Sequence, residues 1–246
     1  MPRRDLTRRS AGHELMDADW VDFATFEGCL RDLERINGWT RSYALTLRWL
    51  DRLMARHGAK RPLVVLDVGS GHGDMLRRIW RWARGRGVEV RLIGMDRSPH
   101  ATAAAARATP HQAPIRYLTA ELFDERHELA TDVVISAMFA HHLDDAGVVR
   151  FLRWMEARAR LGWLINDLHR HPLPYHVSRY APRILRMNRL VRHDAALSVA
   201  RGFKRGDWQR LLTQAEVALP LVTIAWHFPF RYAVGRIKPC PVDPTC

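Results

Sequence analysis

One glycine-rich segment and two histidine-containing segments hold most of the residues that could do chemistry. Three glycines at alternate positions follow a hydrophobic run that ends near a carboxylate, in the order Asp67-Val-Gly69-Ser70-Gly71-His-Gly73. Glycine at such a turn allows a positive φ and lets a bound molecule approach the backbone closely. The segment therefore indicates a binding loop, and the carboxylate beside it favours a ligand that carries an ammonium group.

The spacing of these glycines argues against a dinucleotide. Dinucleotide loops have the pattern G-x-G-x-x-G, which seats a pyrophosphate at a helix N-terminus. Here the third glycine comes one residue early, Asp74 occupies its usual position, and Asp67 would repel a pyrophosphate. A second carboxylate, Asp96, ends the next hydrophobic run, where an α/β nucleotide site binds the ribose hydroxyls. S-adenosylmethionine is an adenosine with an amino-acid tail and no phosphate, and it satisfies all these features.

The histidines are candidates for proton transfer, because a neutral imidazole accepts a proton readily near neutral pH. His141 and His142 follow one hydrophobic run, and His169 and His171 follow the next. His141 is our first candidate for a general base, and His169 and His171 are alternatives that could also contact a substrate. His142 and Tyr175 are candidates for substrate contact. Metal ligation by His169 and His171 is conceivable, but no acidic cluster accompanies this pair, so we expect no metal site.

The elements that would position these residues alternate between strands and helices. Short runs of branched apolar residues predict strands, and apolar positions three and four apart predict helices. The predicted strands are Leu63–Val68, Val90–Met95, Ile115–Leu118, Asp132–Met138 and Gly162–Asn166, with helices at Asp74–Arg84, Pro99–Arg107 and Asp145–Arg160 between them. A hairpin at Leu221–Trp226 and Arg231–Gly235 would close the sheet. The alternation predicts an α/β fold with a doubly wound, mostly parallel sheet that is covered on both faces.

Several further segments flank or interrupt this core. We expect a flexible basic N-terminus (1–12), a helical cap divided at Gly38 (13–60), the sheet domain (61–236) and a C-terminal tail (237–246). An insertion after the fifth strand, at about 169–205, is rich in proline and arginine. Long insertions at the carboxyl end of a strand are more often lids than spacers, so we expect a lid that contains a short helix.

Composition limits the class of protein. The chain has 246 residues, a formal net charge of +13 and 47% hydrophobic residues, which is enough for a buried core. No apolar run reaches the roughly 18 residues of a membrane-spanning helix. The first residues, Met-Pro-Arg-Arg, lack the apolar core of a signal peptide. We therefore expect a cytoplasmic protein whose charge attracts anionic partners without choosing among them.

With these motifs the sequence resembles the class I S-adenosylmethionine-dependent methyltransferases over about residues 63–236. The resemblance implies a Rossmann-like seven-stranded methyltransferase fold with S-adenosyl-L-methionine as cofactor. It implies cofactor contacts at Asp67, Gly69, Ser70, Gly71, Gly73, Asp96, Arg97, Glu121, Leu122 and Ala137. Glu121 stands where the family more often has aspartate. Ser198–Phe203 is similar to the quinone-methylase branch, whereas Glu216-Val217 departs from the glycine-aromatic pair that is usual there.

The resemblance to the small-molecule branch favours a particular function. We expect methylation of a small hydrophobic, hydroxylated acceptor such as a phenol, quinol or polyketide-like secondary metabolite. Oxygen is favoured over carbon, because His141 matches the base position of hydroxyl-methylating members. The net charge raises the alternative of an RNA methyltransferase, and a non-catalytic cofactor-binding scaffold is a second alternative. We expect no specific nucleic-acid partner and either a monomer or a homodimer. The basic lid is also a candidate for contact with a membrane or lipid.

Overall fold

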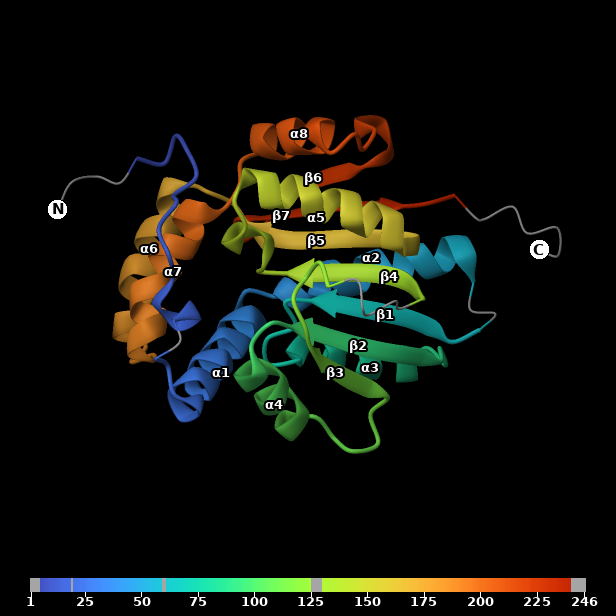
Figure 1. The fold of residues 1–246 in the computed structure, drawn as a ribbon, viewed down its shortest axis with the longest axis horizontal. Helices are drawn as coiled ribbons and strands as arrows, with labels where there is room; N and C mark the ends of the chain where they lie inside the picture. Colours follow the sequence, from blue (N-terminus) through green and yellow to red (C-terminus); the bar gives the residue numbers. More distant parts are fainter. Residues whose placement is uncertain (1–4, 19, 59–60, 125–129, 240–246) are drawn as a thin grey trace.

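The computed structural model describes residues 5–18, 20–58, 61–124 and 130–239 (Figure 1). The helices are α1 (Phe23–Trp39), α2 (Ser42–His57), α3 (Asp74–Arg84), α4 (Pro99–Ala108), α5 (Asp145–Arg158), α6 (Pro172–Ile184), α7 (Arg189–Arg201) and α8 (Arg205–Gln214). The strands are β1 (Leu63–Val68), β2 (Val90–Asp96), β3 (Ile115–Thr119), β4 (Thr131–Ala137), β5 (Ala159–Leu168), β6 (Thr223–His227) and β7 (Arg231–Ile237). Short 3-10 turns occur at Leu15–Asp17, Ala140–His142 and Leu219–Leu221.

The strands form one seven-stranded sheet in the order β3-β2-β1-β4-β5-β7-β6. β1 to β5 pair in parallel, and β7 runs antiparallel to both β5 and β6. The prediction of a doubly wound, mostly parallel sheet closed by a hairpin is confirmed. The strand order reverses between β1 and β4, so the connections after these two strands diverge and leave a crevice at their carboxyl ends.

Helices cover both faces of the sheet. On one face, α2 and α3 pack on strand residues such as Val65 and Ile135. On the other, α5 and α8 pack on residues such as Leu66 and Val134. Neighbouring residues of a strand point to opposite faces of the sheet, so they pack in two different hydrophobic cores. β1 is therefore apolar without interruption until Asp67. This two-sided burial is why the strands are recognisable in the sequence as continuous hydrophobic runs.

Two details of the helical segments differ from the prediction. Helix α1 continues through Gly38 to Trp39, and the break falls at Arg41, which has a left-handed backbone (φ 50°). The lid contains two helices of 13 residues each, α6 and α7, instead of one short helix. The apolar residues that suggest a single helix, from Ile184 to Val191, span the turn between α6 and α7.

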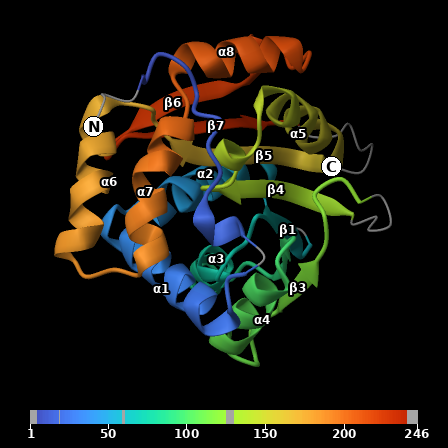
Figure 2. The same cartoon turned by 60° about the vertical axis from the view of Figure 1, so that its left-hand side comes forward.

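The N-terminal segment (residues 5–18) runs along helix α7, as the dark blue trace shows in both views (Figure 1, Figure 2). The Ser10 amide donates to the carbonyl of Ala200 at 3.0 Å, and Arg170 donates to the carbonyl of Leu6 at 3.1 Å. Arg9 donates to the carbonyl of Leu143 at 2.7 Å. The sequence predicts a flexible N-terminus, but these contacts attach residues 5–12 to the body of the fold. Residues 1–4 of that prediction lie outside the described residues.

Two further observations concern the character of the helices and the C-terminal residues. Among the described residues, no helix combines the length and apolar character needed to cross a bilayer. Of the expected C-terminal tail, β7 includes residue 237, and residues 240–246 lie outside the described part.

Candidate active site

A cavity of about 1320 Å³ opens at the carboxyl ends of the parallel strands, beneath α1 and the N-terminal segment. Nine of the ten residues expected to contact the cofactor line it: Asp67, Gly69, Ser70, Gly71, Asp96, Arg97, Glu121, Leu122 and Ala137. The tenth, Gly73, lies at the start of α3 and does not line the cavity. The motif residues at the ends of β1, β2, β3 and β4 therefore meet at one place.

The loop after β1 needs glycine for packing as well as for its backbone shape. Gly69 and Gly73 have φ values of 69° and 70°, which side-chain-bearing residues rarely adopt. A Cβ atom at Gly69 would lie 2.5 Å from the ring of Phe139, and one at Gly73 would overlap the hydroxyl of Tyr117. From the sequence, close approach of a ligand is the expected reason for these glycines. For Gly73 the reason is the neighbouring tyrosine.

Two buried polar groups of this loop lack partners within the described structure. Asp67 is buried and its Oδ1 makes no hydrogen bond, and the same is true of the Ser70 hydroxyl. Burial, followed by the nearby charges of Asp74 and Asp96, raises the pKa of Asp67 well above its ordinary value. A buried carboxyl oxygen without a partner is unfavourable unless a ligand supplies one. An ammonium group in the cavity would do so.

Asp96 is held in place by hydrogen bonds from two backbone amides, one in the glycine loop and one just after β2. Its Oδ2 accepts from the Gly71 amide and its Oδ1 from the Ser98 amide, both at 3.0 Å. A carboxylate has about four acceptor positions on its two oxygens. A carboxylate that orders the glycine loop is thus also a suitable group for binding ribose hydroxyls.

The helical cap is fastened to this loop by a half-buried cluster of charged and polar side chains. Glu34 of α1 contacts His72 Nδ1 at 2.6 Å and accepts from Arg77 at 2.9 Å. The hydrogen bond from His72, together with the charge of Arg77, outweighs burial and lowers the pKa of Glu34 to about 2. Beside it, the Tyr43 hydroxyl of α2 donates to Asp74 Oδ2 at 2.5 Å. The cap thus fixes the position of the loop that begins α3.

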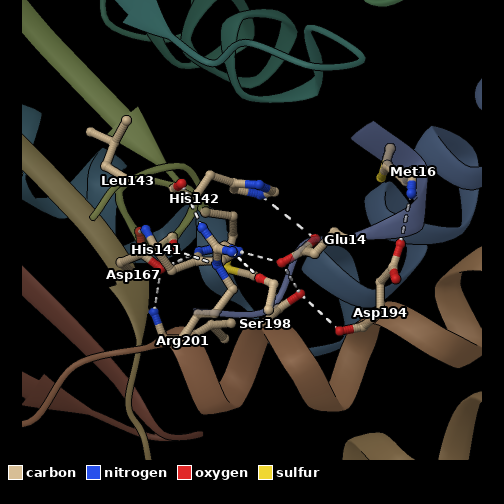
Figure 3. Close-up of polar contacts among 12 residues, drawn as sticks. Glu14, Met16, His141, His142, Leu143, Asp167, Asp194, Ser198 and Arg201 are labelled. Atoms are coloured by element: carbon tan, nitrogen blue, oxygen red, sulfur yellow. Dashed lines mark hydrogen bonds and ion pairs between the residues drawn. The ribbon is translucent and has the colours of Figure 1, made fainter. Parts of the chain in front are cut away.

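A second group of polar residues lies at the other side of the cavity, where His141 and His142 follow β4 (Figure 3). His141 Nδ1 lies 2.7 Å from Asp167 Oδ1, and its Nε2 lies 3.7 Å from Glu14 Oε1. His142 Nε2 lies 3.8 Å from Glu14 Oε2, so the carboxylate of Glu14 faces both imidazoles. His142 and Glu14 line the cavity, whereas the side chain of His141 is buried behind them.

Asp167 and His141 form a buried hydrogen-bonded pair. Burial alone would raise the pKa of Asp167, but the charge of His141 and its hydrogen bonds hold that pKa below the ordinary value. Asp167 also accepts from the backbone amide of His141 at 3.2 Å. The imidazole is therefore fixed with Nε2 directed toward Glu14.

Glu14 reaches this site because the N-terminal segment binds helix α7. Ser198 donates to Glu14 Oε1 at 2.9 Å, and the amides of Leu15 and Met16 donate to Asp194 at 3.0 and 2.9 Å. Arg201 donates to the carbonyls of Gly12, His141 and His142. Sequence reasoning missed Glu14, since nothing in its local pattern distinguishes it from other residues of the cap.

The same three side chains could hold a metal ion. The ligand atoms of Glu14, His141 and His142 lie within 4.8 Å of one another. Two imidazoles and one carboxylate form a ligand set that several divalent metals accept. The sequence-based expectation of no metal site rests on the lack of an acidic cluster beside His169 and His171, whereas the fold brings Glu14 to His141 and His142. A role as base and a role as ligand would compete for the same nitrogen atoms.

Three residues expected to take part in catalysis or substrate binding lie away from the cavity. His169 Nδ1 accepts from the indole of Trp226 at 3.1 Å, and burial, followed by the charge of His171, lowers the pKa of His169 to about 4. His171 accepts from an amide at the start of α6 and stacks on Phe230. Tyr175 packs under α7. The structure does not support these assignments, because the chain turns outward into α6 directly after β5.

The fold and a sequence match together define the class of protein. Residues 65–162 match the family model of a methyltransferase domain. The chain therefore contains a class I methyltransferase domain, and it is an enzyme that uses S-adenosylmethionine.

Several solved structures resemble the whole fold at low sequence identity. The plantazolicin methyltransferase BpumL is 13% identical with a TM-score of 0.58, and the match covers 87% of this chain and 96% of that one. The magnesium protoporphyrin IX methyltransferase from Synechocystis PCC 6803 is 14% identical with a TM-score of 0.55, covering 91% and 90%. The methyltransferase domain of the citrinin polyketide synthase is 13% identical with a TM-score of 0.58, covering 81% and 52%. At this identity the likeness concerns the fold. No curated protein matches the sequence.

Proposed function

We propose that this enzyme transfers a methyl group from S-adenosylmethionine to a hydroxyl oxygen of a small hydrophobic acceptor, such as a phenol, quinol or polyketide-like metabolite. One observation carries the proposal: His142 and Glu14, which could accept a proton, line the cavity together with apolar residues. Met16, Met138, Phe139 and Leu143, which are close to them in the chain, also line it, and we call this part of the lining the acceptor wall. A pocket of this kind fits an apolar ring that carries a hydroxyl group.

The cofactor would lie against the glycine loop. Asp67 would pair with its ammonium group, and Asp96 would accept the ribose hydroxyls. Leu122 would contact the adenine, with Glu121 beside it. When bound, the cofactor supplies a methyl group that is already activated by the positive sulfur. The protein therefore needs to hold the acceptor in line with that methyl and to remove the proton of the hydroxyl.

His142 is our candidate for the group that takes this proton, and this revises the sequence-based choice of His141. His142 lines the cavity, and Glu14 faces its Nε2. A carboxylate beside an imidazole stabilises the imidazolium that forms when the proton arrives. His141, fixed by Asp167, would act as a positioning residue that holds Glu14 and His142 in place. A phenolic hydroxyl has an ordinary pKa of about 10, so removing its proton converts a poor nucleophile into a good one.

The names of structurally similar proteins support a small-molecule acceptor. They refer to plantazolicin, to magnesium protoporphyrin IX and to the citrinin polyketide synthase. None of these names refers to a nucleic acid, and among the described residues the acceptor wall contains no cluster of arginines.

The test is to incubate the purified protein with cofactor that carries a deuterated methyl group and with a panel of phenols, quinols and naphthols. Mass spectrometry should find an organic-extractable product heavier by one labelled methyl, and NMR should place that methyl on oxygen. Transfer only to carbon would contradict the oxygen assignment. Transfer only to tRNA or rRNA, offered in a parallel reaction, would favour the RNA alternative.

A further inference from the structure

Helix α6 carries a stripe of large apolar side chains that face solvent. Leu173, Val177, Tyr180 and Ile184 recur at intervals of four, three and four, which places them on one side of a helix. All four are more than half exposed, and Ile184 is 79% exposed. The opposite side of α6 is covered, because Tyr175 and Pro182 are buried and Tyr175 packs with Val199 and Ala200 of α7. The outer stripe therefore contributes nothing to the core.

The turn between β6 and β7 extends this apolar surface. Phe228 is 80% exposed and Trp226 is 46% exposed. The ring of Phe230 joins the turn to the start of α6, since its centroid lies 5.8 Å from that of Trp226 and 4.9 Å from that of His171. An aromatic turn and an apolar helical stripe thus form one outward surface, which we call the α6 face. A continuous exposed surface of this kind marks an interaction site more often than scattered apolar residues do.

The chain segment that forms α6 and the turn after it carries charge of one sign. No acidic residue occurs between Asp167 and Asp194, and this stretch contains six arginines and four histidines. Arg183, Arg186 and Arg189 are exposed at the end of α6 and the start of α7. Figures 1 and 2 show α6 as the outermost helix at the carboxyl edge of the sheet, with α7 between it and the N-terminal segment. The arginines can therefore reach a flat anionic surface that covers the stripe.

We propose that the α6 face binds the surface of an anionic lipid membrane. An amphipathic helix lies in the headgroup region with its apolar side inserted, while arginines on its flanks bind lipid phosphates. Tryptophan and phenylalanine at the β6–β7 turn suit the same interface. A nucleic acid would satisfy the arginines but would leave the apolar stripe in water. This binding is independent of the acceptor and of the reaction proposed above.

The test is sedimentation of the full chain with vesicles of phosphatidylcholine alone and of phosphatidylcholine mixed with phosphatidylglycerol. We expect binding to the mixed vesicles that weakens with salt, and little binding to the neutral ones. The doubly substituted variant V177D/I184D should lose roughly tenfold or more in partitioning, because inserted apolar side chains are replaced by anions. Arg183→Gln combined with Arg186→Gln should lose roughly 10- to 30-fold, at about 1 kcal/mol for each arginine.

A matched control is Leu221→Asp. Leu221 is 52% exposed, but it lies at the end of β6 away from the β6–β7 turn, so this variant should bind vesicles as the unchanged protein does. Circular dichroism and thermal melting should show that every variant is folded. Equal binding of V177D/I184D and Leu221→Asp would overturn the proposal. Absence of binding to the mixed vesicles, or displacement of the protein from them by tRNA at equal phosphate concentration, would also overturn it.

Discussion

The two sides of the cavity are assembled in different ways. The cofactor side, formed by the glycine loop and Asp96, comes from residues 67–96 and is held by contacts such as the bond from Gly71 to Asp96, 25 residues apart. The acceptor side, formed by Glu14, His141, His142 and Asp167, depends on contacts such as that between Ser198 and Glu14, 184 residues apart. Local motifs can specify the first side. Only the docking of distant segments completes the second.

This difference suggests that the two sides can be damaged separately. Changes on the cofactor side should weaken cofactor binding and leave the chemical step intact. Changes on the acceptor side should slow the chemical step and leave cofactor binding intact.

The largest effect is expected for His142→Ala on the acceptor side. Turnover should fall by roughly two to four orders of magnitude, the range for losing a general base. The dissociation constant of S-adenosylmethionine, measured by calorimetry, should change by a few fold at most. His169→Ala is the matched control and should keep normal turnover, because His169 lies outside the cavity. Unchanged turnover in His142→Ala would remove that residue from the role of base.

The second effect is expected for Asp96→Ala on the cofactor side. Losing hydrogen bonds between a carboxylate and two hydroxyls should weaken cofactor binding by roughly 10- to 100-fold. Turnover at saturating cofactor should change little. The cofactor affinity of Asp96→Asn, which keeps one acceptor oxygen, should lie between those of the unchanged protein and Asp96→Ala. Calorimetry that gave equal affinities for all three proteins would refute the ribose assignment.

A smaller effect is expected for Glu14→Gln, which removes the charge that faces both imidazoles. Turnover should fall by roughly tenfold, the order expected when a neighbouring carboxylate no longer stabilises the imidazolium. Cofactor affinity should be unchanged. The control is Glu27→Gln, an exchange of the same type at a residue of α1 that pairs with Arg31 and does not line the cavity, and its turnover and cofactor affinity should both stay normal. If Glu14→Gln also lost cofactor affinity, the two sides of the cavity would be coupled through the N-terminal segment.

The contact between the cap and the glycine loop gives a pH dependence. The pKa of Glu34 is lowered to about 2 in the folded protein, so its stabilising effect is present above the unfolded value near 4.5 and disappears as the pH falls toward 2. Glu34→Gln should therefore cost about 1 kcal/mol of unfolding free energy near pH 7, allowing for solvent screening of a partly exposed group. Denaturation curves should show this difference shrinking through acidic pH. A difference that grew on acidification would contradict the ion pair.

Removal of divalent metals is expected to have no effect. If His142 accepts the proton, dialysis against EDTA should leave turnover unchanged, because no step needs a cation at Glu14, His141 and His142. Loss of turnover that zinc or manganese restored would make these residues metal ligands. That result would replace the general-base mechanism and leave the cofactor side as described.

The sequence predicted the fold, and the residues that it proposed for cofactor binding lie around one cavity, because both depend on local patterns. β1 and β2 are adjacent and parallel, so the residues that end them, Asp67 and Asp96, must lie at the same edge. Strands buried on two faces also produce apolar runs that are easy to recognise. The prediction of a helical break at Gly38 was wrong, because α1 tolerates this glycine. The turn to α2 falls at Arg41, whose backbone is left-handed.

The acceptor side was only partly predictable. The sequence located the histidine pair after β4, but it could not tell which imidazole would face the cavity, since that depends on the short 3-10 turn at Ala140–His142. It also placed His169 and His171 near the cavity because they follow β5. The outward turn into α6 depends on packing against α7 and the β6–β7 turn, which no local pattern records. Glu14 was missed for the same reason.

The attachment of the N-terminal segment has a consequence for biosynthesis. Arg9 hydrogen-bonds the carbonyl of Arg201, 192 residues later in the chain. At translation rates of roughly 5–20 residues per second, residues 5–14 would wait for about ten seconds or more before their binding partner leaves the ribosome. The nascent enzyme would thus assemble its methyl-donor pocket first and acquire the carboxylate for acceptor chemistry at the end. A partly synthesised chain could then hold cofactor without being able to use it.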